Sequence, residues 1–156
     1  MYRRGAALRY FLDTEYNGTG GALLSLALVP DEGDELYLTL RTDEPIVDWV
    51  QKHVVPYLDS VTEQLSCPRL SRKDAAHHLE RYLRHDEEPL IVADWPEDVA
   101  QFCNLLVTGP GDMVELRHLT FRLMPMSNFS TAANSRVPHN ALHDARALRD
   151  HVLEME

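Results

Sequence analysis

Hydrophobic positions near the start of the chain fall in short runs rather than at helical spacing. An apolar run over residues 6–13 is followed by a glycine-rich turn, and a second run over 22–29 ends at Pro30. Residues 35–41 then alternate between polar and apolar, as a half-buried strand does. Turn-forming residues separate the three runs. The opening of the chain therefore predicts three strands joined as an antiparallel meander.

After the meander, the spacing of hydrophobic positions changes to the helical period. Two helices are predicted, over 44–54 and over 71–84, and Ser71 has the character of an N-cap. The rest of the pattern predicts a buried strand over 90–93, a helix over 98–106, a strand over 113–119, a loop over 120–138 and a helix over 139–153.

This order of elements, β-β-β-α-α-β-α-β-α, predicts one α/β domain over residues 1–156. A meander followed by strand–helix units gives a mixed five-stranded sheet with helices on its faces. Ligands of such sheets collect at the carboxyl ends of parallel strands, near a switch in strand order. We therefore expect a functional site at that edge of the sheet.

Composition and charge narrow the class of protein. The chain of 156 residues is 44% hydrophobic and 26% charged, which is typical of a soluble globular protein. No apolar run approaches the roughly 20 residues of a membrane span, and the charged N-terminus does not lead into a signal peptide, so we expect a cytoplasmic protein. Cys67 and Cys103 match no zinc spacing and give no disulfide framework. The net charge of −10 opposes a broad basic surface for duplex nucleic acid, but it allows an enzyme that holds a few phosphates through metal ions.

Two carboxylates, Asp13 and Glu15, follow the first apolar run at a spacing of two residues. Residues two apart in a strand project from the same face, so these like charges would lie together. A hard divalent cation such as Mg²⁺ or Mn²⁺ is the usual compensation for clustered carboxylates. The simpler interpretation is a solvated strand end in an acidic chain.

The last predicted helix carries a second set of polar residues at its start. His139 and Asp144 lie five apart, so on a regular helix they would point roughly 140° away from each other. The two side chains can meet only if His139 belongs to the frayed beginning of the helix. Ala141 and Ala145 form a small face that lets the helix lie close to the sheet and brings Asp144 beside the first strand. The alternative is a capped surface helix with an incidental histidine.

These motifs resemble those of the DEDDh family of 3′–5′ exonucleases, within the ribonuclease H-like superfamily. The family's first motif, Asp-x-Glu at the end of the first strand, matches Asp13-Thr14-Glu15. Its third motif, His-x-Ala-x-x-Asp-Ala on the last helix, matches the segment from His139 to Ala145. The likeness spans residues 7–153 and is strongest to the small bacterial 3′–5′ exoribonucleases.

The second motif of that family is matched less completely. It is an aspartate that opens a helix after the fourth strand, with an apolar residue four positions on, and Asp98 with Phe102 fits this description. The His-Asn that normally precedes the motif is absent, and Ala93-Asp94 stands in its place. Asp94 is therefore a rival to Asp98.

The resemblance implies a ribonuclease H-like fold, a site for two Mg²⁺ or Mn²⁺ ions, and a role for each motif residue. Two ions about 3.5–4 Å apart stabilise the entering and leaving oxygens of a phosphodiester. Asp13 would bridge both ions, Glu15 and Asp144 would complete the site that binds the attacking water, and Asp98 would orient the second ion. His139 is the candidate general base, because a neutral imidazole accepts a proton near pH 7.

The expected substrate is the 3′ end of single-stranded RNA, released as nucleoside monophosphates. Tyr16 and Leu23 are candidates for substrate contact, since aromatic and apolar side chains stack on single-stranded bases. Thr14, between the two acidic residues of the first motif, is a third candidate for substrate contact. Trp49 and Trp95 are expected to pack in the core or at its rim. DNA as the substrate and a catalytically silent binding module remain as alternatives. A homodimer is also expected as an option, in which the second subunit would form one wall of the substrate site.

Overall fold

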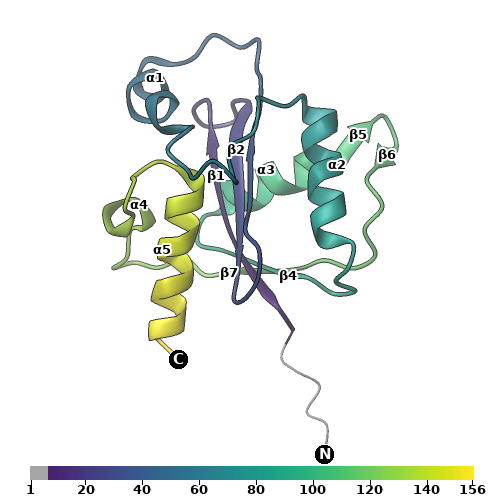
Figure 1. The fold of residues 1–156 in the computed structure, drawn as a ribbon, viewed down its shortest axis with the longest axis vertical. Coiled ribbons are helices and arrows are strands. Elements are labelled where there is room, and N and C mark those ends of the chain that lie inside the picture. Colours follow the sequence, from purple (N-terminus) through teal and green to yellow (C-terminus); the bar gives the residue numbers. More distant parts are fainter. Residues whose placement is uncertain (1–6) are drawn as a thin grey trace, which may run out of the picture.

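The computed structural model describes residues 7–156 and shows an α/β protein built on a five-stranded mixed sheet (Figure 1). The strands of this sheet are, in chain order, β1 (Arg9–Tyr16), β2 (Leu23–Pro30), β3 (Leu36–Thr39), β4 (Leu90–Ala93) and β7 (Thr120–Leu123). Their spatial order is β3-β2-β1-β4-β7. The pairs β1–β2 and β2–β3 are antiparallel, whereas β1–β4 and β4–β7 are parallel. The predicted meander and mixed sheet are confirmed, and the arrangement is compatible with a ribonuclease H-like fold.

Helices cover both faces of the sheet (Figure 1). The yellow helix α5 packs on one face against β1, β2 and β3, while α3 packs on the opposite face and α2 lies beside it. The helical segments of the described chain are α1 (Asp48–His53), the 3₁₀ turn η1 (Val55–Tyr57), α2 (Arg72–Leu83), α3 (Pro96–Leu106), α4 (Thr131–Asn134) and α5 (Ala141–Glu154). A separate hairpin consists of β5 (Val107–Gly109) and β6 (Asp112–Met113).

The alternation of side chains along β1 divides the core between the two faces. Leu12 packs in the cluster that contains the buried residues of α2 and α3. Phe11, its neighbour in sequence, packs with Leu148 and Val152 of α5. Because successive strand residues point to opposite faces, Asp13 and Glu15 lie on the same face as Phe11, toward α5.

A buried hydrogen-bond network fixes the start of α5. Asn140 is the N-cap, and its side-chain oxygen accepts from the backbone N–H groups of Leu142 and His143 at 3.1 and 3.3 Å. Its Nδ2 donates to the Tyr57 carbonyl at 2.8 Å and to the Tyr37 hydroxyl at 3.3 Å. Asn140 therefore ties α5 both to β3 and to the turn after α1, which lies above the start of α5 in Figure 1.

The first predicted helix begins later than expected, at Asp48 rather than at residue 44. The side chain of Asn17 explains the difference, because it binds the preceding segment in an extended form. Its Oδ1 accepts from the Val47 N–H at 2.9 Å, and its Nδ2 donates to the Pro45 carbonyl at 2.9 Å. The helix over 71–84 is confirmed, and Ser71 caps it by accepting from the Asp74 N–H.

The predicted strand over 113–119 is wrong, and the fifth strand of the sheet is β7, inside the expected loop. Val114 is buried and Leu116 packs on the core, but the backbone between them takes an irregular path. The N–H of Glu115 donates to the Glu80 carboxylate instead of to a strand. Apolar side chains can be buried from an irregular segment, so their pattern alone misplaced the strand by several residues.

The other boundaries differ by smaller amounts. β1 starts at Arg9 and continues to Tyr16, so both acidic residues lie within the strand; residues 1–6, including the first position of the expected strand, lie outside the described chain. The final helix runs from Ala141 to Glu154, two residues later than expected at its start. None of the helices in residues 7–156 combines the length and apolar character that a membrane crossing requires.

We expect Asn140→Ala to lower the free energy of unfolding by about 2–4 kcal/mol, because it removes an N-cap and leaves buried backbone groups without partners. Urea unfolding monitored by circular dichroism measures the change. Ser71→Ala, which removes a cap from α2 at a partly exposed position, should cost only about 1 kcal/mol. Equal losses in the two variants would show that the buried bonds of Asn140 add nothing to its capping role.

Candidate metal centre

Acidic side chains from separate elements meet at the carboxyl end of β1. Asp13 and Glu15 come from β1, Asp94 directly follows β4, Asp98 lies in the first turn of α3, and Asp144 lies in the first turn of α5. They line one open cavity of about 580 Å³. The sheet brings them together because β1 and β4 are parallel and end at the same edge, while α3 and α5 begin there on opposite faces.

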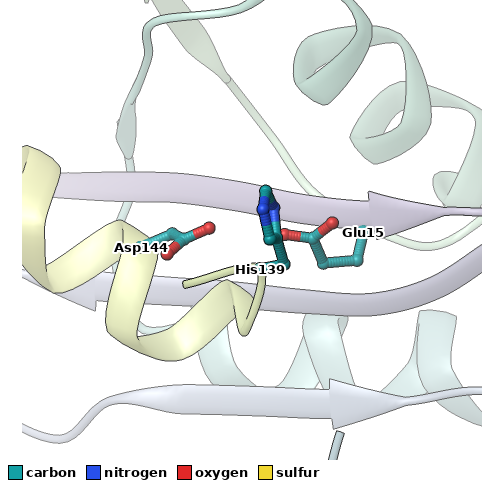
Figure 2. A group of neighbouring side chains, drawn as sticks. All are labelled: Glu15, His139 and Asp144. Atoms are coloured by element: carbon teal, nitrogen blue, oxygen red, sulfur yellow. The ribbon is translucent and has the colours of Figure 1, made fainter. Parts of the chain in front are cut away.

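The acidic side chains form two adjoining groups. In one group, ligand atoms of Asp13, Asp94 and Asp98 lie within 4.8 Å of one another. In the other, ligand atoms of Glu15, His139 and Asp144 do so, and Figure 2 shows these three side chains turned toward one another. Asp13 and Glu15, two residues apart on the same face of β1, join the groups. Either group could hold a metal ion.

Thr14 fixes the carboxylate of Asp98 from the other face of β1. Its hydroxyl donates to Asp98 Oδ1 at 2.6 Å and its backbone N–H donates to the same atom at 3.2 Å. The predicted role of Thr14 in substrate contact remains untested, although the residue also lines the cavity. Both rival aspartates of the second motif reach Asp13: Asp98 is buried and anchored by Thr14, whereas Asp94 is only partly buried.

His139 stands just before α5 with a left-handed backbone, at φ 65°. Few residues other than glycine adopt this conformation, and it turns the chain sharply between the wall of the cavity and the helix. The imidazole therefore swings back over the first turn of α5, as the five-residue spacing to Asp144 requires. Burial lowers the pKa of His139, and the neighbouring His53 adds to the shift.

Burial is the main cause of the raised pKa values in the cavity, and repulsion between carboxylates adds to it. The pKa of Asp13 is raised well above its ordinary value, mainly by burial and then by the charge of Asp98. The pKa of Glu15 rises to about 9 through burial and the charge of Asp144. The pKa values of Asp98 and Asp144 rise to about 7 and about 6, while the hydrogen bonds from Thr14 to Asp98 limit the first of these shifts.

Two buried carboxylate oxygens have no hydrogen-bond partner in the described chain, Asp13 Oδ2 and Asp144 Oδ1. Asp13 is only 7% exposed and Asp144 only 2%. Buried polar atoms are nearly always paired, so such atoms in an acidic cavity fit a bound cation. A donor set of carboxylates and one imidazole suits Mg²⁺ or Mn²⁺ better than the softer metals that prefer thiolate.

The predicted substrate-contact residues Tyr16 and Leu23 lie in different surroundings: one lines the cavity and the other is buried in the core. Tyr16 lines the cavity and is partly exposed. Leu23 is only 1% exposed and packs in the core cluster of α2 and α3, so it offers no surface on which a base could stack. Trp49 and Trp95 were expected in the core or at its rim, and their exposure of 53% and 59% excludes the core. Trp49 packs at the surface against His139, and Trp95 lines the cavity.

Sequence reasoning missed several residues that build the site. The only local signal for Asn140 was its position just before the hydrophobic spacing of the last helix begins, where asparagine is a favoured N-cap. The wall of the cavity opposite β1 comes from residues 125–132, expected only as loop. Phe129 in this wall stacks on His151 of α5, with ring centroids 3.8 Å apart. No periodic pattern marks such a wall, since its side chains pack individually.

We expect Mn²⁺ at millimolar concentration to raise the melting temperature, because a ligand that binds only the folded state stabilises it by mass action. Asp13→Ala should lose most of this rise, since Asp13 adjoins both acidic groups. Asp150→Ala, which removes an exposed carboxylate further along α5, should keep it. An unchanged melting temperature of the wild type with Mn²⁺ would contradict a cation site here.

Without metal, we expect the melting temperature to fall as the pH rises from about 5 to about 8. The folded protein holds protons on Asp144, Asp98 and Glu15 up to pKa values of about 6, 7 and 9, whereas the unfolded chain releases them near pH 4. The folded state therefore binds more protons in this window and loses stability as they leave. Thermal scans in chelator measure the slope, which saturating Mn²⁺ should flatten; a stability that rises with pH in chelator would contradict the burial of these carboxylates.

Comparison with known proteins adds no family to this picture. No family model matches the sequence, and no curated protein matches it. A functional assignment therefore depends on the geometry and chemistry of the cavity and on the motifs that supply its residues.

Proposed function

We propose that this protein is a metal-dependent 3′–5′ exoribonuclease of the DEDDh type, with a ribonuclease H-like fold. One observation carries the proposal: the residues of all three motifs meet in a single cavity that contains two unpartnered buried carboxylate oxygens. These residues are Asp13, Glu15, Asp98, His139 and Asp144. Motifs that matched by chance would have no reason to converge from β1, α3 and α5.

The position of the cavity in the sheet supports the same function. It lies at the carboxyl end of β1, which pairs antiparallel with β2 on one side and parallel with β4 on the other. Ligand sites of open α/β sheets form at the carboxyl ends of strands where the strand order reverses, and the order β3-β2-β1-β4-β7 reverses between β1 and β4. The acidic residues lie at this edge of the sheet, and their position supports the proposal of a substrate site there.

The two acidic groups fit hydrolysis of a phosphodiester. Divalent ions bound there would supply charge stabilisation at both the entering and the leaving oxygen. On the protein's side, Asp13 and Glu15 are held by the central strand of the sheet, and Thr14 locks Asp98 in place. A rigid strand holds carboxylates in fixed positions more firmly than a loop would, which favours a preorganised site.

His139 is the proposed general base. Its lowered pKa keeps the imidazole neutral near pH 7, so that a ring nitrogen can accept a proton from water. The ring nitrogen lies within 4.8 Å of oxygens from Glu15 and Asp144. Since these two carboxylates are proposed to complete the site of the attacking water, this proximity supports the role of His139 as the base. His139 is only partly buried and lines the cavity.

The proposed substrate is the 3′ end of single-stranded RNA. A net charge of −10 leaves little basic surface to follow a duplex, so binding would depend on phosphates at the metal centre and on a few side chains. Tyr16 and Trp95 line the cavity as aromatic surfaces on which a base can stack. A carboxylate such as Glu15 near the terminal ribose could accept from its 2′-hydroxyl, the group that distinguishes RNA from DNA.

We expect single-stranded RNA to be shortened from its 3′ end in the presence of Mn²⁺, with release of nucleoside monophosphates. Matched RNA and DNA oligonucleotides, labelled at either end and incubated in low salt with Mn²⁺ or chelator, test direction, sugar preference and metal dependence together. Faster loss of DNA would assign the protein to the deoxyribonucleases. Binding without hydrolysis would favour a silent nuclease-fold module, and internal or 5′ cleavage would remove the exonuclease proposal.

We expect His139→Ala to lower turnover by roughly 10²–10⁴-fold, the range for loss of a general base. The Mn²⁺-dependent rise in melting temperature should survive, because the carboxylates remain. Parallel measurement of turnover and of thermal stability distinguishes a base from a ligand. Loss of the Mn²⁺ effect would make His139 a metal ligand, and unchanged turnover would leave it only a structural role.

A further inference from the structure

A cluster of aromatic rings lies behind the proposed base, outside the acidic cavity. Trp49 and His53 lie one turn apart on α1, with ring centroids 4.8 Å apart. The ring of Trp49 meets that of His139 edge-to-face, at 5.0 Å between centroids and 80° between planes. The ring of His53 is 6.3 Å from that of His139. The three rings form a contiguous cluster that ends at the metal centre.

The position of α1 is fixed by contacts on its other side. Val50 and Val54 are buried with Leu24 of β2 and with Leu58, so the inner side of this short helix is anchored in the core. Asn17 holds the segment that enters the helix, and Asn140 binds the turn that leaves it. With its inner side anchored, α1 presents Trp49 and His53 at a defined place beside His139.

The imidazole of His139 lacks the hydrogen-bond partner that usually orients a catalytic histidine. Within residues 7–156 its ring forms no hydrogen bond and no ion pair, and its defined neighbours are the aromatic rings of α1 and the carboxylates of the cavity. Its backbone is in the left-handed region, at φ 65°, which residues other than glycine seldom adopt. The direction of the ring must therefore be set by packing.

We propose that Trp49 is a positioning residue that holds the His139 imidazole toward Glu15 and Asp144 through an edge-to-face contact, with the ring of His53 tilted at 32° against the indole. This inference rests on the proposed function of His139. Aromatic pairs in this geometry prefer a defined mutual orientation, so the indole can restrict a ring that no hydrogen bond restricts. Trp49 itself lies outside the residues that line the cavity, so it acts through His139.

The structure also suggests a different role for Trp49 that the same measurements can exclude. An indole that is 53% exposed beside a nuclease site could serve as a stacking platform for a base. Loss of a platform weakens substrate binding and raises KM, whereas loss of positioning lowers kcat while KM stays nearly constant. The two roles therefore separate in steady-state kinetics.

The first experiment measures kcat and KM on a 3′-terminal RNA substrate for Trp49→Ala, Trp49→Phe and Gln51→Ala. A small misplacement of a reacting group costs up to roughly 10²-fold, so we expect Trp49→Ala to lower kcat by about 10- to 100-fold with KM changed by less than about twofold. Trp49→Phe, which preserves an edge-to-face contact, should recover most of kcat. Gln51→Ala, at an exposed position of the same helix, should match the wild type. A raised KM with normal kcat, or normal kinetics, would overturn the proposal.

A double-mutant cycle tests whether Trp49 acts through His139. In the His139→Ala background, Trp49→Ala should have no further effect on kcat, since the group that it positions is gone. Effects that multiply would show that Trp49 acts independently, which contradicts the proposal. Melting temperatures of all variants identify any loss of folding, which is not expected because Trp49 is largely exposed.

An NMR measurement separates failure of this inference from failure of the proposed function. The His139 ring protons should carry a ring-current shift from the indole that Trp49→Ala abolishes and Trp49→Phe partly retains. Absence of this shift in the wild type would overturn the inference even in an active enzyme. Its presence in a protein in which His139→Ala leaves turnover unchanged would instead refute the base assignment on which the inference rests.

Discussion

The burial of several carboxylates in one cavity is the constraint on which the rest of this structure depends. Asp13 is almost fully enclosed, and the charges of Asp98, Glu15, Asp144 and Asp94 all act on it. A cluster of this kind is unfavourable in the ionised state unless protons or cations compensate the charge. The fold must therefore supply enough stabilisation elsewhere to hold the acidic residues together, and the acidic groups could hold a cation that offsets their charge.

That stabilisation comes from apolar side chains that β1 buries on both of its faces. One face carries Leu12 into the core beneath α2 and α3, and the same side of the strand lets Thr14 bind Asp98. The other face carries Phe11 into the core beneath α5 before it presents Asp13. Ala141 and Ala145 have no exposed surface and pack on β2, so α5 lies close enough for Asp144 to reach the cavity.

The periphery of the cavity is held by aromatic contacts and by single buried polar residues. Asn140 connects the start of α5 with Tyr37 and with the turn after α1, while the Tyr37 hydroxyl donates to the Leu58 carbonyl at 2.6 Å. On the opposite side, Phe129 is stacked on His151 and holds the wall over residues 125–132 against α5. The hydrogen bonds of Asn140 hold the start of α5, and the stacking on His151 holds its last turn. The same helix therefore connects Asp144, the preceding His139 and the wall over residues 125–132.

The sequence by itself determined the strands of the meander and the helices over 71–84 and 98–106, because each depends on local spacing. Successive side chains of a strand point to opposite faces, and this rule was enough to place Asp13 and Glu15 on one face of β1. Only the tertiary structure decided where the fifth strand lies, since Val114 is buried from an irregular segment and β7 is defined by its pairing with β4. It likewise decided that Leu23 is enclosed, and that Trp49 lies against His139. Contacts between residues about ninety positions apart depend on how elements pack, and no local pattern encodes that.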